Sequence, residues 1–391
     1  MVDSLISDDN DQHLAATLVA YRHRFQQSKT YKALQWSQKS QIEPPVCELC
    51  DMAVPLNVVI EVLTKSRLTN KQLCAITFGC EKQSDFPVFS WNVTFPDKPK
   101  PPPRPPQPPA PGSPKLSVLH LSDIHVDFGY KPGSMVACLA PLCCRDGQPV
   151  LADSWIKLGL PVDTRDSILR GAFYTTIIRP GLRLVSLNMN YCPKENYWLY
   201  INSTDPLDQL QWLIHWLQYA EDHNEKVHII GHHPPQDCLV AFSWNFHKII
   251  NRYENTIAGQ FYGHRHNDEF AVVYDEVDPK RPVSMMYIGP SLTTESFLNP
   301  GYRVFSIDGD YSGSSYWVLD HRTVIMNLTA SNIYNQTIFV DEYSARGAYQ
   351  MENLFPADWN DVAISFFVIL DILQSIFHID CTRNEIARIR C

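Results

Sequence analysis

The chain has 391 residues, of which 45% are hydrophobic and 12% are aromatic. This composition supplies enough apolar surface for one large domain with smaller appendages, and it excludes a mainly disordered protein. The formal charge of −9 argues against a nucleic-acid-binding protein, which would carry a basic patch or stripe. Protonation of all 14 histidines would reverse this charge, so the charge balance depends on the acidity of the compartment.

Cysteines and glycosylation sequons indicate a secretory route. The chain contains 11 cysteines, which favours disulfides in an oxidising compartment, with metal thiolates as the alternative. Sequons of the N-x-[ST] type begin at Asn92, Asn202, Asn327 and Asn335. The acidic N-terminal stretch, in contrast, has neither the basic n-region nor the apolar h-region of a signal peptide. We assign residues 1–44 to no domain.

Two short regions precede the main domain. Residues 45–82 combine helical spacing of apolar side chains with four cysteines, Cys47, Cys50, Cys74 and Cys80, which predicts a helical hairpin tied by disulfides. Residues 95–115 are rich in proline and predict a stiff polyproline II spacer between domains. The PxxP pattern of this linker also allows an SH3 ligand as the alternative.

Alternating strands and helices follow the linker. Short apolar strands that end in polar residues are predicted at residues 115–123, 182–190, 226–235 and 257–266. A helix is predicted over Asp205–His223, with Asp205 as its cap and Pro206 in its first turn. This alternation indicates an α/β layer structure with reactive groups at the carboxyl ends of strands.

The last part of the chain looks different. Residues 281–293, 302–310 and 316–321 are predicted to form an antiparallel second sheet. The longest apolar run, Val362–Phe377, contains Asp371 and is too short to cross a bilayer comfortably. We therefore expect an amphipathic helix there, either buried or at the surface, and no transmembrane segment.

Paired ionisable residues close two of the predicted strands. Residues i and i+2 of a strand point to the same face, so Asp123 and His125 in "SDIH" are directed at one point. His264 and His266 in "GHRH" repeat this arrangement at another strand end. Any one of these histidines alone is more often a structural residue, but the recurrence at strand ends predicts a metal site.

A third strand ends in "GHHPP", which offers two further histidines. We choose His232, directly after the glycine, as the ligand, and we expect His233 to point away. Imidazole and carboxylate ligands together suit zinc, and manganese or iron less specifically.

The order D-x-H, G-H, G-H-x-H resembles that of the calcineurin-like metallophosphoesterases. Further stretches resemble the acid sphingomyelinase family, including "LHLSDIHVDFGY", "NSTDPLDQLQWL", "VHIIGHHPP" and "LNPGYRVFSIDGDYSGSSYWVLDH". The resemblance runs from about Pro45 to the C-terminus. By this resemblance, residues 45–82 are similar to the second half of a saposin domain. A proline-rich linker, here residues 95–115, is also expected at this place in the family.

This resemblance implies a fold, an activity and a compartment. Residues 116–325 would form a layered metallophosphoesterase β-sandwich flanked by helices, followed by a helical C-terminal region at residues 326–391. The implied activity is hydrolysis of sphingomyelin to ceramide and phosphocholine by water activated between two zinc ions. The enzyme would be a lysosomal or secreted monomer whose saposin part takes lipid from a membrane surface.

The resemblance also implies how the zinc ligands are shared. Asp123, His125 and His266 would bind one ion, and His232 and His264 would bind the other. The family has two further blocks, a G-D segment with a bridging Asp and a G-N-H-E segment, and neither is found between about residues 147 and 170. The carboxylates nearby, which we leave unassigned, are Asp146, Asp153, Asp163 and Asp166.

The same gap affects strands and cysteines. Two or more central strands would be absent with the two blocks, which predicts unpaired strand edges. Cys47, Cys74, Cys80 and Cys144 would lack their family partners. The disulfide pairs that remain are Cys138–Cys143, Cys192–Cys238 and Cys381–Cys391.

Three hypotheses for function follow. The first is a sphingomyelin phosphodiesterase by descent, with reduced or lost activity. The second is a non-catalytic lipid-binding variant or a truncated isoform. The third is another phosphodiesterase or nucleotide pyrophosphatase of the same superfamily, against which the saposin-like part and the proline-rich linker argue.

Overall fold

The structure is a computed structural model, and it describes residues 65, 66, 68, 72, 90–124, 151–295 and 298–365. The chain divides into two compact units, of which the first, Met1–Glu61 with Ala137–Leu142, lies outside the described residues. All described residues belong to the second unit, Val62–Val136 with Cys143–Cys391. Several predictions fall outside the described residues, namely residues 1–44, most of residues 45–82, His125, Cys138, Cys143, Cys144, Asp146, Cys381 and Cys391.

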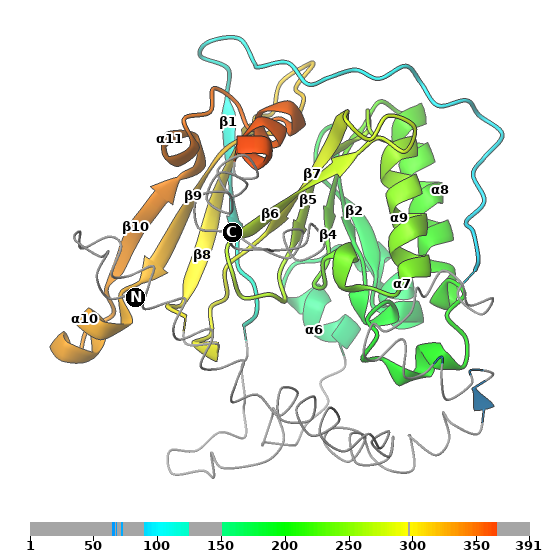
Figure 1. The fold of residues 1–391 in the computed structure, drawn as a ribbon, viewed down its shortest axis with the longest axis horizontal. Helices are drawn as coiled ribbons and strands as arrows, with labels where there is room; N and C mark the ends of the chain where they lie inside the picture. Colours follow the sequence, from blue (N-terminus) through cyan, green and yellow to red (C-terminus); the bar gives the residue numbers. More distant parts are fainter. Residues whose placement is uncertain are drawn as a thin grey trace, which may run out of the picture. The chain divides into compact units, whose positions relative to one another are not determined.

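The described strands form two sheets (Figure 1), a four-stranded one in the order β1-β8-β9-β10 and a six-stranded one in the order β2-β3-β4-β5-β7-β6. The first sheet contains β1 (Lys115–His120), β8 (Gly301–Asp308), β9 (Val318–Met326) and β10 (Phe339–Ser344). The second contains β2 (Tyr174–Arg179), β3 (Leu182–Ser186), β4 (Lys226–Ile230), β5 (Ile257–Tyr262), β6 (Glu269–Tyr274) and β7 (Pro282–Ile288). A mixed α/β fold with layered sheets, as predicted, is confirmed.

The six-stranded sheet has a parallel centre and antiparallel edges. Strands β3, β4, β5 and β7 pair in parallel, while β2 and β6 pair antiparallel to their neighbours. Helix α8 (Gln209–Asp222) lies between β3 and β4 in the chain, and α9 (Val240–Arg252) lies between β4 and β5. This is the alternation that the sequence predicts, and it directs the carboxyl ends of β4 and β5 to one edge.

Two strands, β7 and β1, belong to a different sheet from the one that the sequence predicts. Strand β7 was predicted in the antiparallel second sheet, but it pairs in parallel with β5. Its residues are buried on both faces, which is typical of a central strand rather than of a half-exposed antiparallel one. Strand β1, which was grouped with the parallel strands, pairs antiparallel with β8 instead.

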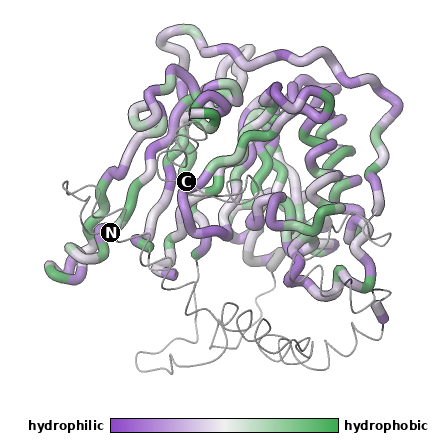
Figure 2. The backbone as a smooth tube through the Cα atoms, in the orientation of Figure 1, coloured by the Kyte–Doolittle hydropathy of each residue, from purple (hydrophilic) through white to green (hydrophobic). Residues whose placement is uncertain are grey.

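The hydrophobic core has two layers. One cluster packs the six-stranded sheet against α8 and α9 through side chains such as Val227, Ile229, Leu213 and Phe246. The other packs the two sheets face to face, for example through Phe261 and Phe305. Figure 2 shows hydrophobic residues along the central strands, whereas α8 and α9 alternate between hydrophilic and hydrophobic.

Helix α8 begins at Gln209, four residues after the predicted cap Asp205, but Asp205 still caps its first turn. Asp205 accepts hydrogen bonds from the backbone of Leu210 at 2.8 Å and of Gln211 at 3.0 Å. Its carboxylate therefore satisfies two N–H groups that lack a partner within the helix. A short 3₁₀ turn, Pro206–Asp208, separates this cap from α8. Buried leucines at helical spacing then hold the helix against the sheet.

The chain that leads into the proline-rich region, together with the start of that region, is hydrogen-bonded to α9 and to the turn after it. We call residues 91–104 the strap, and it passes α8 and α9 in Figure 1. Asn245 of α9 accepts from Val93 N and donates to Trp91 O, both at 2.8 Å. Asn255 accepts from Arg104 N at 2.7 Å and donates to Pro102 O at 2.8 Å. The two asparagine side chains thus satisfy backbone groups of the strap at both of its ends.

The remaining helices are short. They are α6 (Leu151–Lys157), α7 (Arg165–Gly171), α10 (Leu328–Tyr334), α11 (Ala345–Tyr349) and a helix at residues 356–365. Residues 326–391 were expected to form a helical region, and the described part of it also contains β10, because Phe339–Ser344 pairs antiparallel with β9. None of the helices in the described ranges is both long and apolar enough to cross a membrane.

Candidate metal centre

The loops that follow β1, β4, β5 and β7 meet at one place. Ser122 forms a parallel bridge with Ser291, and its carbonyl accepts from Leu292 N at 3.1 Å. The His232 carbonyl accepts from Gly263 N at 2.9 Å, which joins the loop after β4 to the loop after β5. Three of the strands that the sequence predicts to end in ionisable residues therefore deliver these residues to a common site.

Gly263, the glycine of "GHRH", is required by the closeness of the loops. A Cβ atom at this position would lie 1.7 Å from Ser122 Oγ and 2.7 Å from Asp123 Oδ2. Real Cβ atoms do not approach other heavy atoms so closely, so only glycine allows the loop after β5 to pass beside Asp123.

Asp123 is buried at the centre of the site. Its Oδ2 accepts from Ser122 Oγ at 2.5 Å and from His264 N at 2.9 Å. Its Oδ1 lies 3.3 Å from His266 Nε2 and 3.6 Å from His232 Nε2. Burial raises the pKa of this carboxyl, but the Ser122 hydrogen bond and the adjacent His232 outweigh it, so the pKa is lowered overall. The side chain is an ionised carboxylate placed between two imidazoles.

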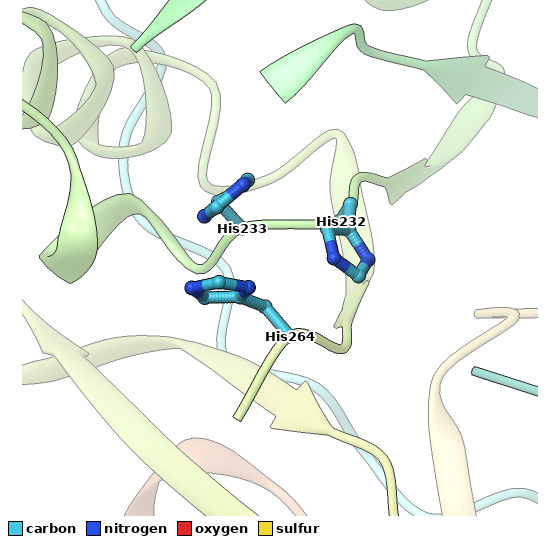
Figure 3. A group of neighbouring side chains, drawn as sticks. All are labelled: His232, His233 and His264. Carbon is cyan, nitrogen blue, oxygen red and sulfur yellow. The ribbon is translucent and has the colours of Figure 1, made fainter. Parts of the chain in front are cut away.

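A second group of side chains consists of His232, His233 and His264 (Figure 3), whose ligand atoms all lie within 4.8 Å of one another. The rings of His233 and His264 are 3.7 Å apart between centroids. The expectation that His233 points away is therefore wrong. Strand alternation no longer applies at this position, because β4 ends at Ile230 and the chain bends at His232 and His233.

His264 and His266 reach different groups although they are two residues apart. His264 joins His232 and His233, whereas His266 contacts Asp123. Both have left-handed backbone angles, with φ of 73° and 62°, and Asp123 has a φ of 52°. Such angles in residues other than glycine cost about 1–3 kcal/mol each and are concentrated at functional sites.

Burial also sets the protonation of His233. Burial first, and then the neighbouring His264 and His232, lower the pKa of this imidazole to about 4. A neutral imidazole has a nitrogen lone pair that can bind a metal ion. At pH values well above 4 the side chain is thus in the form that a ligand requires.

Arg265, which sequence reasoning missed, ties two of the loops together. Its guanidinium donates to both carboxylate oxygens of Asp237 at 2.8 Å, and it donates to Glu269 at 2.7 Å. Asp237 belongs to the 3₁₀ turn Pro235–Asp237 that follows "GHHPP". The bidentate pair therefore holds the loop of His232 and the loop of His264 in register.

A buried ion pair holds the far end of the same loop. Arg303 of β8 is 1% exposed and pairs with Asp268, two residues after His266. Asp268 also accepts from Thr323 Oγ1 of β9 at 2.6 Å. The four-stranded sheet thereby positions a loop that extends from the six-stranded sheet. This contact joins distant parts of the chain, and no local pattern in the sequence signals it.

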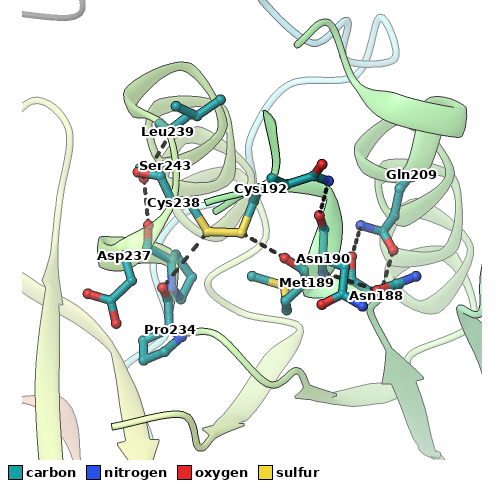
Figure 4. The surroundings of a disulfide bond; sticks show 12 residues. Asn188, Met189, Asn190, Cys192, Gln209, Pro234, Asp237, Cys238, Leu239 and Ser243 are labelled. Atoms are coloured by element: carbon teal, nitrogen blue, oxygen red, sulfur yellow. Dashed lines mark hydrogen bonds between the residues drawn. A yellow bond between two sulfur atoms is a disulfide. The ribbon is translucent and has the colours of Figure 1, made fainter. Parts of the chain in front are cut away.

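A cavity of about 370 Å³ opens beside the histidines. It is lined by Asn190, Pro193, Glu195, Asn196, His233 and His264. The Cys192–Cys238 disulfide, one of the predicted pairs (Figure 4), joins Cys192, which precedes the lining residue Pro193, to Cys238, and its Cα atoms are 4.8 Å apart. The disulfide joins the turn after β3 to the start of α9 and so restrains the segment that carries the lining residues Asn190 and Pro193.

The other predicted site residues lie elsewhere. Three unassigned carboxylates, Asp153, Asp163 and Asp166, are exposed, and Asp153 pairs with Arg165. The four sequon residues are also exposed: Asn92, Asn202, Asn327 and Asn335. Asn327 caps α10 through its side-chain oxygen.

No protein-family model matches the chain, but curated proteins do. Sphingomyelin phosphodiesterase of Bos taurus is 38% identical over 435 residues, which cover 82% of this chain and 69% of the bovine protein. The Homo sapiens sphingomyelin phosphodiesterase is 48% identical over 58% of this chain and 36% of its own length. Sphingomyelin phosphodiesterase 2 of Caenorhabditis elegans is 44% identical over 55% of this chain and 35% of its own length. Since the bovine alignment is longer than the 391 residues of this chain, parts of the bovine sequence have no counterpart in it.

Proposed function

This chain belongs to the sphingomyelin phosphodiesterase family, and on that premise we propose that it hydrolyses sphingomyelin to ceramide and phosphocholine. The observation that carries the proposal is the meeting of Asp123, His232, His264 and His266 beside a cavity. A carboxylate and several imidazoles at one edge of a sheet are the groups that a metal-dependent hydrolase requires.

The donor set fits zinc. Zinc in proteins is bound by imidazole nitrogen and carboxylate oxygen, and the residues on both sides of Asp123 supply these atoms. Asp123 and His266, with His125, would hold one ion, and His232 and His264 would contribute to the other. When bound, zinc polarises a phosphodiester and lowers the pKa of a coordinated water towards neutrality.

The chain's own residues would prepare the site for this chemistry. The ionised carboxylate of Asp123 offsets positive charge between the two groups of histidines. Arg265 and Asp237 hold the ligand loops in position, which limits reorganisation during the reaction. The cavity beside His233 and His264 gives the phosphodiester headgroup access to the ligands.

We further propose a lysosomal or secreted location with sphingomyelin presented at a membrane surface. The disulfide between Cys192 and Cys238 and four exposed sequon asparagines support an oxidising secretory route. The predicted partial saposin part at residues 45–82 would supply the contact with lipid, and we propose that the protein acts as a monomer.

The test is to express the protein in a eukaryotic secretory host, count bound zinc per chain, and measure sphingomyelin turnover at acidic pH. We expect two zinc ions and turnover that the substitution His264→Ala abolishes. His215→Ala, which removes an exposed histidine of α8, is the matched control and should leave turnover unchanged. One zinc ion or none, together with no turnover, would contradict the proposal.

A second candidate is a non-catalytic lipid-binding form. Two observations favour it. Parts of the bovine relative have no counterpart in this chain, and in the described residues β1 pairs only with β8, which leaves Leu119 57% exposed. Such a form would bind sphingomyelin vesicles without consuming the lipid. Sequencing of the transcript between the codons for Arg145 and Gly171 would show whether further coding sequence exists in other transcripts.

A further inference from the structure

We propose that His232, His233 and His264 form a three-histidine site for one divalent transition-metal ion, with His233 as the third protein ligand. This inference rests on the metal centre of the proposed function and deepens it. With His232 and His264 alone, the site would have two protein ligands, whereas catalytic zinc sites usually have three and an open fourth position. His233 supplies the missing one.

The distances between the rings support this assignment. The ligand atoms of the three side chains lie within 4.8 Å of one another. Zinc–nitrogen bonds of about 2.0–2.1 Å require nitrogens no more than ~4 Å apart, so a movement of roughly 1 Å closes the site. The His232 side chain is 48% exposed, so its ring has room to rotate by this amount.

The environment of His233 gives an independent reason. Its Nδ1 atom is buried and has no hydrogen-bond partner within the described part of the chain. A buried polar atom without a partner costs free energy, about 1–3 kcal/mol for a neutral group. Packing of the His233 ring against His264 gives that nitrogen no partner. A metal ion bound by this nitrogen would supply one and offset the cost of its burial.

The backbone fixes the two loops that carry the ligands. The His232 carbonyl accepts from Gly263 N at 2.9 Å, and His264 N donates to Asp123 at 2.9 Å. His232 and His233 come from one loop and His264 from the other (Figure 3), and all three lie in the described part of the chain. The site is therefore complete without any ligand from residues 125–150.

The open position of the site faces the cavity. His233 and His264 both line it, together with the polar side chains of Asn190, Glu195 and Asn196. A fourth ligand on the ion, either water or a phosphate oxygen, would thus enter from the side where a substrate has room. Asp123 Oδ1 lies 3.6 Å from His232 Nε2 and 3.3 Å from His266 Nε2, so this carboxylate lies between the three-histidine site and His266.

The experiment measures metal binding directly. Metal-free full-length protein is titrated with Co²⁺, and the visible absorption and calorimetric stoichiometry are recorded before and after competition with Zn²⁺. We expect two ions on the wild type, and His233→Ala should weaken one of them by at least ~10-fold. His233→Cys keeps a metal ligand and should restore binding, with new thiolate-to-Co²⁺ absorption.

His215→Ala serves as the control for loss of a histidine, and circular dichroism of each variant checks that the fold is retained. The proposal is overturned if folded His233→Ala binds both ions with wild-type affinity, or if His233→Cys shows no thiolate absorption. These results are separate from those that test the function. Wild-type protein that binds two ions but does not hydrolyse sphingomyelin would contradict the proposed function and leave the three-histidine site standing.

Discussion

Two groups of histidines in this protein differ in their place on the strands. His232, His233 and His264 follow strand ends, and His233 and His264 line a cavity that opens to solvent. His120 of β1, His228 of β4 and His321 of β9 contact aromatic rings, and His228 and His321 are buried while His120 is half-buried. The comparison shows that a histidine's position on its strand, more than its neighbours in sequence, decides whether it is available to a ligand.

The interior histidines also differ from the strand-end histidines in their hydrogen-bond partners and backbone conformation. Burial lowers the pKa of His228 to about 4, and burial together with Arg303 lowers the pKa of His120 to about 4. His228 Nε2 donates to Tyr316 O at 2.8 Å, so this nitrogen already has a partner. These interior histidines act as neutral core residues, whereas the backbone of His264 is held in a left-handed conformation that directs its ring to other imidazoles.

The largest loss of turnover is expected from a substitution that displaces the strand-end histidines and leaves the interior histidines in place. Gly263→Ala would place a Cβ atom against Ser122 and Asp123, so the loops must separate. A displacement of about 1 Å costs ~100-fold in rate, so we expect sphingomyelin turnover to fall by at least that factor and bound zinc to decrease. Gly347→Ala is the matched control, because a Cβ there meets only Ser344 Oγ at 3.9 Å. Turnover in Gly263→Ala equal to that of Gly347→Ala would refute the packing argument.

The second prediction concerns the interior histidines and the dependence of the free energy of unfolding on pH. The unfolded chain protonates His228 near pH 6.5, but the folded chain does so only near 4. Between these values the unfolded state binds more protons, so the free energy of unfolding falls as pH decreases, by about 3 kcal/mol for this residue. Above about pH 6.5 the contribution of neutral His228 to the free energy of unfolding is complete.

Urea unfolding of metal-free protein, followed by tryptophan fluorescence at several pH values, measures this dependence. His228→Gln retains a donor for Tyr316 O and should make the decrease between pH 6.5 and 4 shallower. His223→Gln, at an exposed position after α8, should leave the slope unchanged. An equal slope in all three proteins would show that His228 is not kept neutral by the fold.

The smallest effect tests how the strand-end loops are held. Arg265→Lys removes the bidentate contact with Asp237 but keeps the positive charge. We expect turnover to fall by roughly 10-fold, equivalent to about 1.4 kcal/mol, with little change in the free energy of unfolding. Arg322→Lys alters an exposed pair with Asp341 and should have no effect on either quantity. If both substitutions reduce turnover equally, the Asp237 contact is not what positions the histidines.

Much of the fold was predictable because its signals are local. The cap at Asp205, the apolar spacing of α8 and the strands before Asp123, His232 and His264 all follow from residues close together in sequence. The placement of β7 could not be predicted in this way, because contacts between residues far apart in the sequence determine which strands pair. Burial of this strand on both faces nevertheless agrees with its composition, because Ser284 is the one small polar side chain among otherwise mostly apolar residues of Pro282–Ile288.

The site was predictable to a similar extent. Strand alternation led to His232 and His264, but it gave the wrong direction for His233, because the chain has already left strand geometry there. The pairs Arg265–Asp237 and Arg303–Asp268 were missed because their partners are far apart in the sequence. These pairs decide where the ligand loops lie, and only the folded arrangement reveals them.

The strap has a consequence for proteolysis. An exposed turn at Ala110–Ser113, with Gly112 at a φ of 85°, follows the strap and offers a protease an accessible backbone. Cleavage there would cut the chain but not the hydrogen bonds from Asn245 and Asn255 to the strap. The two fragments should then migrate as one particle under native conditions and separate only in denaturant, so a nicked preparation would be recognised by denaturing electrophoresis and missed by size-exclusion chromatography.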